Sequence, residues 1–260
     1  SHIYALILLF LAAALIIFQL KKSGEEKSFF AWFKHPNHLG LAAIFSSMAG
    51  IMILSFSRSF WMGGVFGLLA FLFLLVFTLR LSFAFLFRSS IVFFVLLLLS
   101  FGLVYGVGNF PYPKINEGFN ASLLKNRFAS FTGEAAVVSR WNLLPVLWTE
   151  IKKTPVFGSG FGATATYVSK DPRVLEMNPT GEFTTFTFEW GYLDMWLKFG
   201  FLGLALYGFL LARLWQIGFR LLKTTTDDEE LFLTAGLLSG FAALSVTHFF
   251  SPYLNHPLGI

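Results

Sequence analysis

The sequence predicts an all-α polytopic membrane protein with about six transmembrane helices and a long, partly helical extracytoplasmic loop between the fourth and the fifth. Of the 260 residues, 56% are hydrophobic and only 13% are charged, whereas soluble proteins have about 45–50% apolar and about 25% charged residues. The mean hydropathy is +0.69. This composition excludes a soluble enzyme, a disordered chain and a nucleic-acid-binding domain, although the net charge is +5.

Six apolar stretches are long enough to cross a bilayer as helices, which requires about 20 mostly apolar residues. Each stretch is a continuous apolar block without the alternation of a β-barrel strand. Only helices and closed barrels satisfy their backbone hydrogen bonds in lipid, so helices are expected. The six stretches are approximately residues 3–20, 39–56, 60–79, 91–108, 190–214 and 231–250.

Basic residues predict the orientation of these spans, because cytoplasmic loops carry an excess of Lys and Arg. Nine of the 19 basic residues lie in three short loops that fall on one side if the six spans alternate; these loops are residues 21–38, 80–90 and 213–230. We predict that this side is cytoplasmic. The opposite, outer side then holds residues 57–59, 109–189 and 251–260.

The predicted organisation has three parts. Residues 1–108 form four transmembrane helices, residues 109–189 form the extracytoplasmic loop, and residues 190–260 form two transmembrane helices and an outer tail. The chain begins with Ser1 instead of Met and ends at Ile260 directly after an apolar run. We therefore expect one membrane domain that is a fragment of a longer chain.

The outer segment 109–189 contains an amphipathic pattern. Between residues 139 and 153, Trp141, Leu144 and Trp148 recur three and four positions apart and so share one face of a helix. Such a helix is typical of segments that lie in the membrane interface.

Two arginines are candidate site residues on the outer side. Arg58 lies between the second and third spans, where an arginine either snorkels to the interface or serves a site, because its charge is costly in lipid. Arg140 begins the amphipathic helix, and taken alone it also fits a solvated surface charge. The residues themselves leave both alternatives open.

Two carboxylates open the fifth span. Glu189 and Asp194 suit the positive end of a helix dipole without any catalytic role, and we prefer this interpretation for Asp194. Lys198 follows Asp194 by four residues, so the two side chains are predicted to form an ion pair on one helix face. Glu189 lies at the membrane boundary, where a base would meet a membrane-borne substrate.

Glycines and histidines give weaker signals. Gly158 and Gly160 could form a backbone nest for a phosphate. We prefer a tight turn, because no strand precedes them and no Lys-Ser/Thr follows, so neither the P-loop nor the dinucleotide fingerprint is present. His256 is the one histidine placed to join chemistry on the outer face. No metal site is predicted, because the histidines do not converge and the chain has no cysteine.

The order of several short motifs resembles the O-antigen ligase and polymerase superfamily of bacterial membrane glycosyltransferases. The motifs are Pro36-Asn37, Ser57-Arg58-Ser59, Ser139-Arg140-Trp141, Pro155-Val156-Phe157-Gly158-Ser159-Gly160, and Glu189-Trp190 followed after nine residues by Gly200-Phe201-Leu202-Gly203. The chain departs from the ligases in two ways. A glutamate, Glu189, stands where the ligases have a histidine, and we expect the N-terminal half of the usual set of spans to be missing from this sequence.

The resemblance implies a metal-independent glycosyltransferase of the bacterial cytoplasmic (inner) membrane that needs no cofactor. Its partners would be a polyprenyl-diphosphate-linked glycan donor, a glycan or lipid acceptor, and membrane lipids, but no nucleic acid. Arg58 and Arg140 would hold the diphosphate, with Gly158, Gly160 and His256 as further donor contacts. Glu189 would accept the proton of the attacking hydroxyl.

Three alternatives remain open at this point. The first is an O-antigen or exopolysaccharide polymerase of the same superfamily. The second is a non-enzymatic transporter of lipid-linked glycans, which would be expected to have broken helices and polar residues near the middle of the bilayer. The third is a non-catalytic scaffold whose outer segment binds cell-wall polymers.

Overall fold

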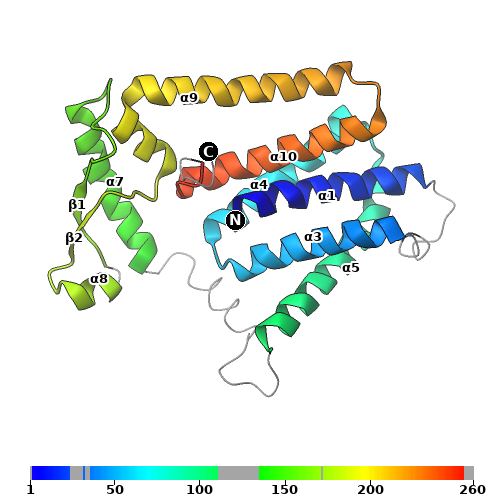
Figure 1. The fold of residues 1–260 in the computed structure, drawn as a ribbon, viewed down its shortest axis with the longest axis horizontal. Helices are drawn as coiled ribbons and strands as arrows, with labels where there is room; N and C mark the ends of the chain where they lie inside the picture. The colour runs from blue at the N-terminus through cyan, green and yellow to red at the C-terminus, as the bar shows by residue number, and fades with distance from the viewer. Residues whose placement is uncertain (1, 24–31, 33–35, 111–134, 171, 255–260) are drawn as a thin grey trace. The chain divides into compact units, whose positions relative to one another are not determined.

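A computed structural model describes residues 2–23, 32, 36–110, 135–170 and 172–254 of the chain. The chain forms two compact units (Figure 1). The first unit comprises residues 1–120 and 214–247, and the second comprises residues 121–213 and 248–260. The two C-terminal helices, α9 (Gly191–Thr224) and α10 (Asp228–Phe250), each contribute residues to both units.

The structure confirms the prediction of an all-α polytopic membrane protein, because each predicted span coincides with a helix. In the described part of the chain, five helices are long and apolar enough to cross a membrane. The second predicted span lies in α3 (Pro36–Leu54), whose apolar part His38–Leu54 is shorter than the other five. This helix ends two residues earlier than predicted because Phe56 adopts a left-handed backbone conformation with a φ of 47°.

The other spans also have shifted ends. The third span is α4 (Arg58–Phe73) continued by the π-helical turn η1 (Leu74–Thr78), and the fourth is α5 (Phe83–Gly108). α5 begins inside the predicted loop 80–90, because the hydroxyl of Ser82 caps it by accepting from the Phe85 N–H at 3.3 Å. α9 runs ten residues past the predicted end, since long basic side chains suit the last turns of a helix.

Small residues allow three helices of the first unit to approach closely. On α10, a Cβ at Gly236 would lie 2.8 Å from the Phe10 carbonyl oxygen, and one at Gly240 would lie 2.9 Å from the Ile7 Cα, both on α1 (His2–Lys22). On α4, a Cβ at Gly67 would lie 2.7 Å from the Ala243 Cβ of α10. Glycines at four-residue spacing are the usual means of close helix contact in membranes, where dispersion replaces the hydrophobic effect.

The helix α5 lies beside α3 and leaves most of its apolar surface exposed. α3 packs against both α1 and α5 (Figure 1), and the Ser46 hydroxyl donates to the Leu96 carbonyl oxygen at 3.1 Å. Of the most apolar window of α5, only 22% is buried. A helix that is apolar on every side and mostly exposed is stable only in lipid, so this surface is typical of a membrane-facing helix.

The second unit contains residues 135–170 and 172–189 of the predicted outer segment. It consists of α7 (Ala135–Lys153), a two-stranded antiparallel hairpin, a short helix, and the first part of α9. The strands β1 (Ala165–Val168) and β2 (Glu182–Thr185) pair Ala165 with Thr185 and Val168 with Glu182, and α8 (Pro172–Met177) lies between them. The sequence motifs did not predict this hairpin, because its strands are only four residues long.

Candidate active site

The helix α7 supplies the core of the second unit. Leu143, Leu147 and Ile151 lie four residues apart and are buried, and they pack against a cluster that includes Phe188, Trp190 and Leu197. The helix predicted at residues 139–153 is therefore present, and the face that it buries inside the protein carries Leu143, Leu147 and Ile151.

The two tryptophans flank this buried stripe. Trp141 is 59% exposed and Trp148 is 44% exposed. Exposed tryptophans on this helix are compatible with a position in the membrane interface, which stays a prediction.

Arg140 and Glu189 form an ion pair at the start of α7. The Arg140 Nε donates to Oε2 of Glu189, and Nη2 donates to Oε1 at 3.2 Å, so the contact is bidentate. The indole Nε1 of Trp190 donates to the Arg140 carbonyl oxygen at 3.0 Å. The ion pair is open to solvent, with half of the Glu189 side chain exposed.

A turn formed by residues 154–160 holds the other end of α7 to α9. α9 is broken at Gly200, whose φ of 68° and ψ of −175° are adopted by glycine and essentially no other residue. The break leaves the Leu197 and Lys198 carbonyl oxygens without helical partners, and the Ser159 and Gly160 N–H groups donate to them at 2.7 and 3.0 Å.

The same turn also satisfies the donors beyond the break. The Phe201 N–H donates to the Pro155 carbonyl oxygen at 2.8 Å, and the Leu202 N–H donates to that of Val156 at 3.3 Å. The indole of Trp196 donates to the Pro155 carbonyl oxygen as well, at 3.1 Å. A broken helix is tolerated in a membrane protein only where its freed backbone groups find partners, and the turn 154–160 supplies them.

The consequence is that α7 is fixed to α9 at both ends. Its first turns are tied to Glu189 and Trp190, and its last turn leads into the turn 154–160 at Gly200. The core described above fills the space between them. The Arg140–Glu189 pair is therefore held by rigid elements on both sides, which is the arrangement that preorganises a site.

A second ion pair lies one turn further along α9. The Lys198 Nζ is 2.7 Å from the Asp194 Oδ1, and the side chains are only 13% and 3% exposed. This confirms the ion pair predicted from their four-residue spacing. It is largely buried, in contrast to Arg140–Glu189, so each charge reduces the cost of burying the other.

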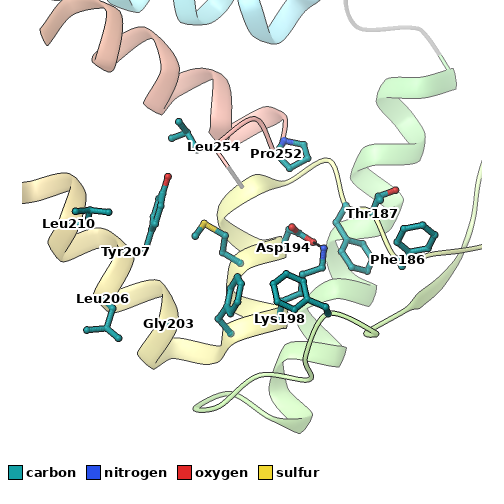
Figure 2. A pocket seen from close by; sticks show the side chains of 14 residues that line it. Phe186, Thr187, Asp194, Lys198, Gly203, Leu206, Tyr207, Leu210, Pro252 and Leu254 are labelled. Atoms are coloured by element: carbon teal, nitrogen blue, oxygen red, sulfur yellow. Dashed lines mark ion pairs between the residues drawn. The ribbon is translucent and has the colours of Figure 1, made fainter. Parts of the chain in front are cut away.

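The buried pair lines a cavity of about 750 Å³ in the second unit (Figure 2). The walls are predominantly apolar, and Figure 2 shows Asp194 and Lys198 pointing toward each other beside the cavity. Residues 186–188, directly before Glu189, form part of the wall. The remaining lining residues are Phe161, Met195, Phe199, Gly203, Leu206, Tyr207, Leu210, Pro252 and Leu254.

Arg58 belongs to the first unit. It is the first residue of α4 and is partly buried, and the neighbouring Ser57 and Ser59 hydroxyls lie 3.0 Å apart. A cation at the start of a helix adds to the positive end of the helix dipole.

The other predicted site residues are Gly158, Gly160 and His256. Gly158 and Gly160 have positive φ values of 74° and 79°, and their N–H groups donate to the carbonyl oxygens of Thr154 and Lys198. These donors are engaged within the protein, which favours the tight turn over the phosphate nest. His256 lies outside the described residues. Within the described ranges, no three histidine or carboxylate side chains are grouped so that they could hold a metal ion.

Sequence reasoning missed two features of this site. The cavity itself was not predicted, although the spacing that paired Asp194 with Lys198 marked a charged spot on an apolar helix. The function of Gly200 was also missed, and the signal was the presence of two glycine-rich motifs, at 158–160 and 200–203, that the structure brings together.

A comparison with known protein families finds a match that covers the candidate site residues Arg58, Arg140 and Glu189. A family model described as O-antigen ligase matches residues 43–208, which is more than half of the chain. The matched region includes Arg58, α7, the turn 154–160, Glu189 and the first part of α9. No curated protein and no solved structure matches the chain.

Proposed function

We propose that this chain, which belongs to the O-antigen ligase family, transfers a glycan from a polyprenyl-diphosphate-linked donor to an acceptor hydroxyl. The reaction takes place on the outer side of the bacterial cytoplasmic membrane. The observation that supports the proposal is the Arg140–Glu189 ion pair, in which α7 and the segment directly before α9 place a guanidinium and a carboxylate side by side. We propose that the guanidinium binds the diphosphate and that the carboxylate is the base.

In the proposed reaction, Arg140 binds the donor diphosphate. A guanidinium has five N–H donors in a planar fork and can bind phosphate oxygens in a bidentate manner. In this structure the fork binds one carboxylate in this manner, that of Glu189, and 32% of the Arg140 side chain is exposed. When the donor diphosphate takes over part of this contact, the Glu189 carboxylate becomes available to a second group.

Glu189 then acts as the general base. Its carboxylate accepts the proton of the acceptor hydroxyl while the hydroxyl oxygen attacks the anomeric carbon of the donor sugar. The bond from that carbon to the diphosphate oxygen breaks, and polyprenyl diphosphate leaves with the electron pair. Arg140 stabilises the charge that develops on the leaving group, and we propose that Arg58 contributes to the same task, without a metal ion.

Transfer by the purified full-length protein in the presence of EDTA tests this proposal. Arg140→Ala and Arg58→Ala should each abolish transfer of a labelled glycan from a polyprenyl-diphosphate donor, and Glu189→Gln should reduce its rate by about 10²–10⁴-fold. Arg220→Ala, at the predicted cytoplasmic end of α9, is the matched control and should retain activity. Retained activity in both Arg140→Ala and Arg58→Ala would exclude the mechanism.

One observation favours a polymerase as the second candidate. Glu189 stands where the ligases of the resembling superfamily have a histidine, so the acceptor could be a growing glycan instead of a lipid core. Incubation with donor alone separates the two candidates. A polymerase forms longer lipid-linked glycans from donor alone, whereas a ligase forms product only when a separate acceptor is added.

A further inference from the structure

We infer that the cavity beside Lys198 binds the isoprenoid units nearest the diphosphate of the donor, and that Lys198 is an additional cationic contact of this diphosphate. The inference rests on the proposed function and adds a lipid-binding site to it. The ligand chemistry is that of a phosphate ester on a hydrocarbon chain.

The walls of the cavity fit a hydrocarbon chain. Its volume of about 750 Å³ is within the range of about 300–1,000 Å³ that is usual for small-molecule sites. Leu206 and Leu210 line it from the part of α9 beyond the Gly200 break, together with Leu254 (Figure 2). Apolar walls with a single charged spot match an amphipathic ligand, because burial of a hydrocarbon chain is favourable only against apolar surface.

The charged spot presents a cation to the ligand. Both residues line the cavity, but Asp194 is almost completely buried whereas the Lys198 side chain is 13% exposed, so Lys198 is the more accessible of the two. An ammonium has three N–H donors, and the contact with Asp194 can coexist with contacts to phosphate oxygens. Asp194 thus orients Lys198, and the Phe188 ring lies 5.7 Å below its Nζ.

The residues that line the cavity include the three that directly precede Glu189 in the sequence, and this connects the cavity to the proposed reaction. Phe186, Thr187 and Phe188 line the cavity, and Glu189 is the next residue. Lys198 lies before the Gly200 break, and Leu206, Tyr207 and Leu210 lie after it. A ligand with its diphosphate at Lys198 therefore has its reacting end toward the segment that carries Glu189 and its chain along the later turns of α9.

Equilibrium binding of farnesyl diphosphate to the full-length protein in detergent, measured by titration calorimetry, tests the charged contact. The variant D194N/K198Q removes both charges and avoids leaving one of them buried without its partner. We expect its affinity for farnesyl diphosphate to fall by about tenfold, because a charge-assisted contact is lost, and its affinity for farnesol to be unchanged. Lys152→Gln, on the exposed face of α7, is the control and should bind as the wild type does.

A second pair of variants tests the apolar wall. Leu206 and Phe209 are 72% and 71% exposed on neighbouring turns of α9, but only Leu206 lines the cavity. Leu206→Trp should therefore weaken the binding of both farnesyl diphosphate and farnesol, while Phe209→Trp should not. Equal effects of the two substitutions would overturn the assignment of the chain to this cavity.

Three other outcomes would also overturn the inference. These are wild-type affinity of D194N/K198Q for farnesyl diphosphate, equal binding of farnesol and farnesyl diphosphate, and displacement of farnesyl diphosphate by dioleoylphosphatidylglycerol. The last outcome would identify a site for ordinary membrane phospholipid. If Arg140→Ala abolishes glycan transfer while D194N/K198Q binds and transfers normally, this inference fails and the proposed function stands.

Discussion

Gly158 and Gly200 are packed backbone against backbone, so that neither position has room for a side chain. A Cβ at Gly200 would lie 2.5 Å from the Gly158 backbone nitrogen, and a Cβ at Gly158 would lie 2.5 Å from the Lys198 carbonyl oxygen. Backbone atoms cannot move aside as a flexible side chain can. The two glycines therefore join the turn 154–160 to the break in α9, and through this joint they hold α7 in place.

Substitution of either glycine is predicted to weaken this joint. Gly158→Ala and Gly200→Ala should each lower the free energy of unfolding by at least about 2 kcal/mol, from the left-handed backbone penalty together with the steric clash. Gly160→Ala is a matched control, because Gly160 has a φ of 79° but no atom within 4 Å of an added Cβ. It should cost only the backbone penalty, about 1–2 kcal/mol. Thermal unfolding in detergent measures the difference, and equal losses at all three positions would contradict the close packing.

The Arg140–Glu189 pair should affect transfer far more than stability. Because both side chains are substantially exposed, the pair is expected to contribute only about 0–1 kcal/mol to folding. Glu189→Gln should nevertheless reduce the rate of glycan transfer by about 10²–10⁴-fold, the usual effect of losing a general base. The exchanged variant R140E/E189R preserves an ion pair and should fold normally without transferring glycan. Parallel measurement of unfolding temperature and transfer rate distinguishes this result from a structural role, for which the exchanged variant would be active.

The buried Asp194–Lys198 pair, in contrast, should contribute strongly to stability. Asp194→Ala leaves the Lys198 ammonium buried without its counter-ion and should cost about 3–5 kcal/mol of stability. D194N/K198Q has no charge to bury and should recover most of this loss. A double-mutant cycle on unfolding free energies measures the coupling. Additive losses from the two single substitutions would contradict the contact.

Close helix contacts in the first unit can be tested with two glycines. Gly67→Ala places a Cβ 2.7 Å from that of Ala243, so it should destabilise the protein by about 1–3 kcal/mol through overpacking. Gly106 of α5 has no atom within 4 Å of an added Cβ, and Gly106→Ala should be neutral or stabilising, because alanine is the better helix former. Unfolding in detergent or bicelles compares them, and equal stability of the two variants would contradict close packing between α4 and α10.

Much of the fold was predictable from local patterns. Continuous apolar blocks located all six helices, because a membrane span needs only length and apolar composition. Their ends were less predictable, as the early end of α3 at the left-handed Phe56 and the long extension of α9 illustrate. The hairpin β1–β2 escaped prediction because four-residue strands with mixed burial give no clear period.

The site was predictable only in part. The four-residue spacing paired Asp194 with Lys198 correctly, since both lie on one helix. The contact between Arg140 and Glu189 joins residues that are 49 positions apart in the sequence. Local sequence patterns cannot predict a contact over such a separation. The roles of Arg58, Arg140 and Glu189 in transfer stay predictions, as do the orientation of the chain in the membrane and the contribution of His256.

By itself, the sequence determined that this protein is a helical membrane protein of the O-antigen ligase family, because hydropathy and short ordered motifs are properties of the linear chain. The tertiary structure decided which face of α7 is buried, that Gly158 meets Gly200, and that Lys198 borders a cavity. These outcomes depend on packing between segments far apart in the chain, where side-chain shape and the satisfaction of freed backbone groups select one arrangement among many that the local pattern allows.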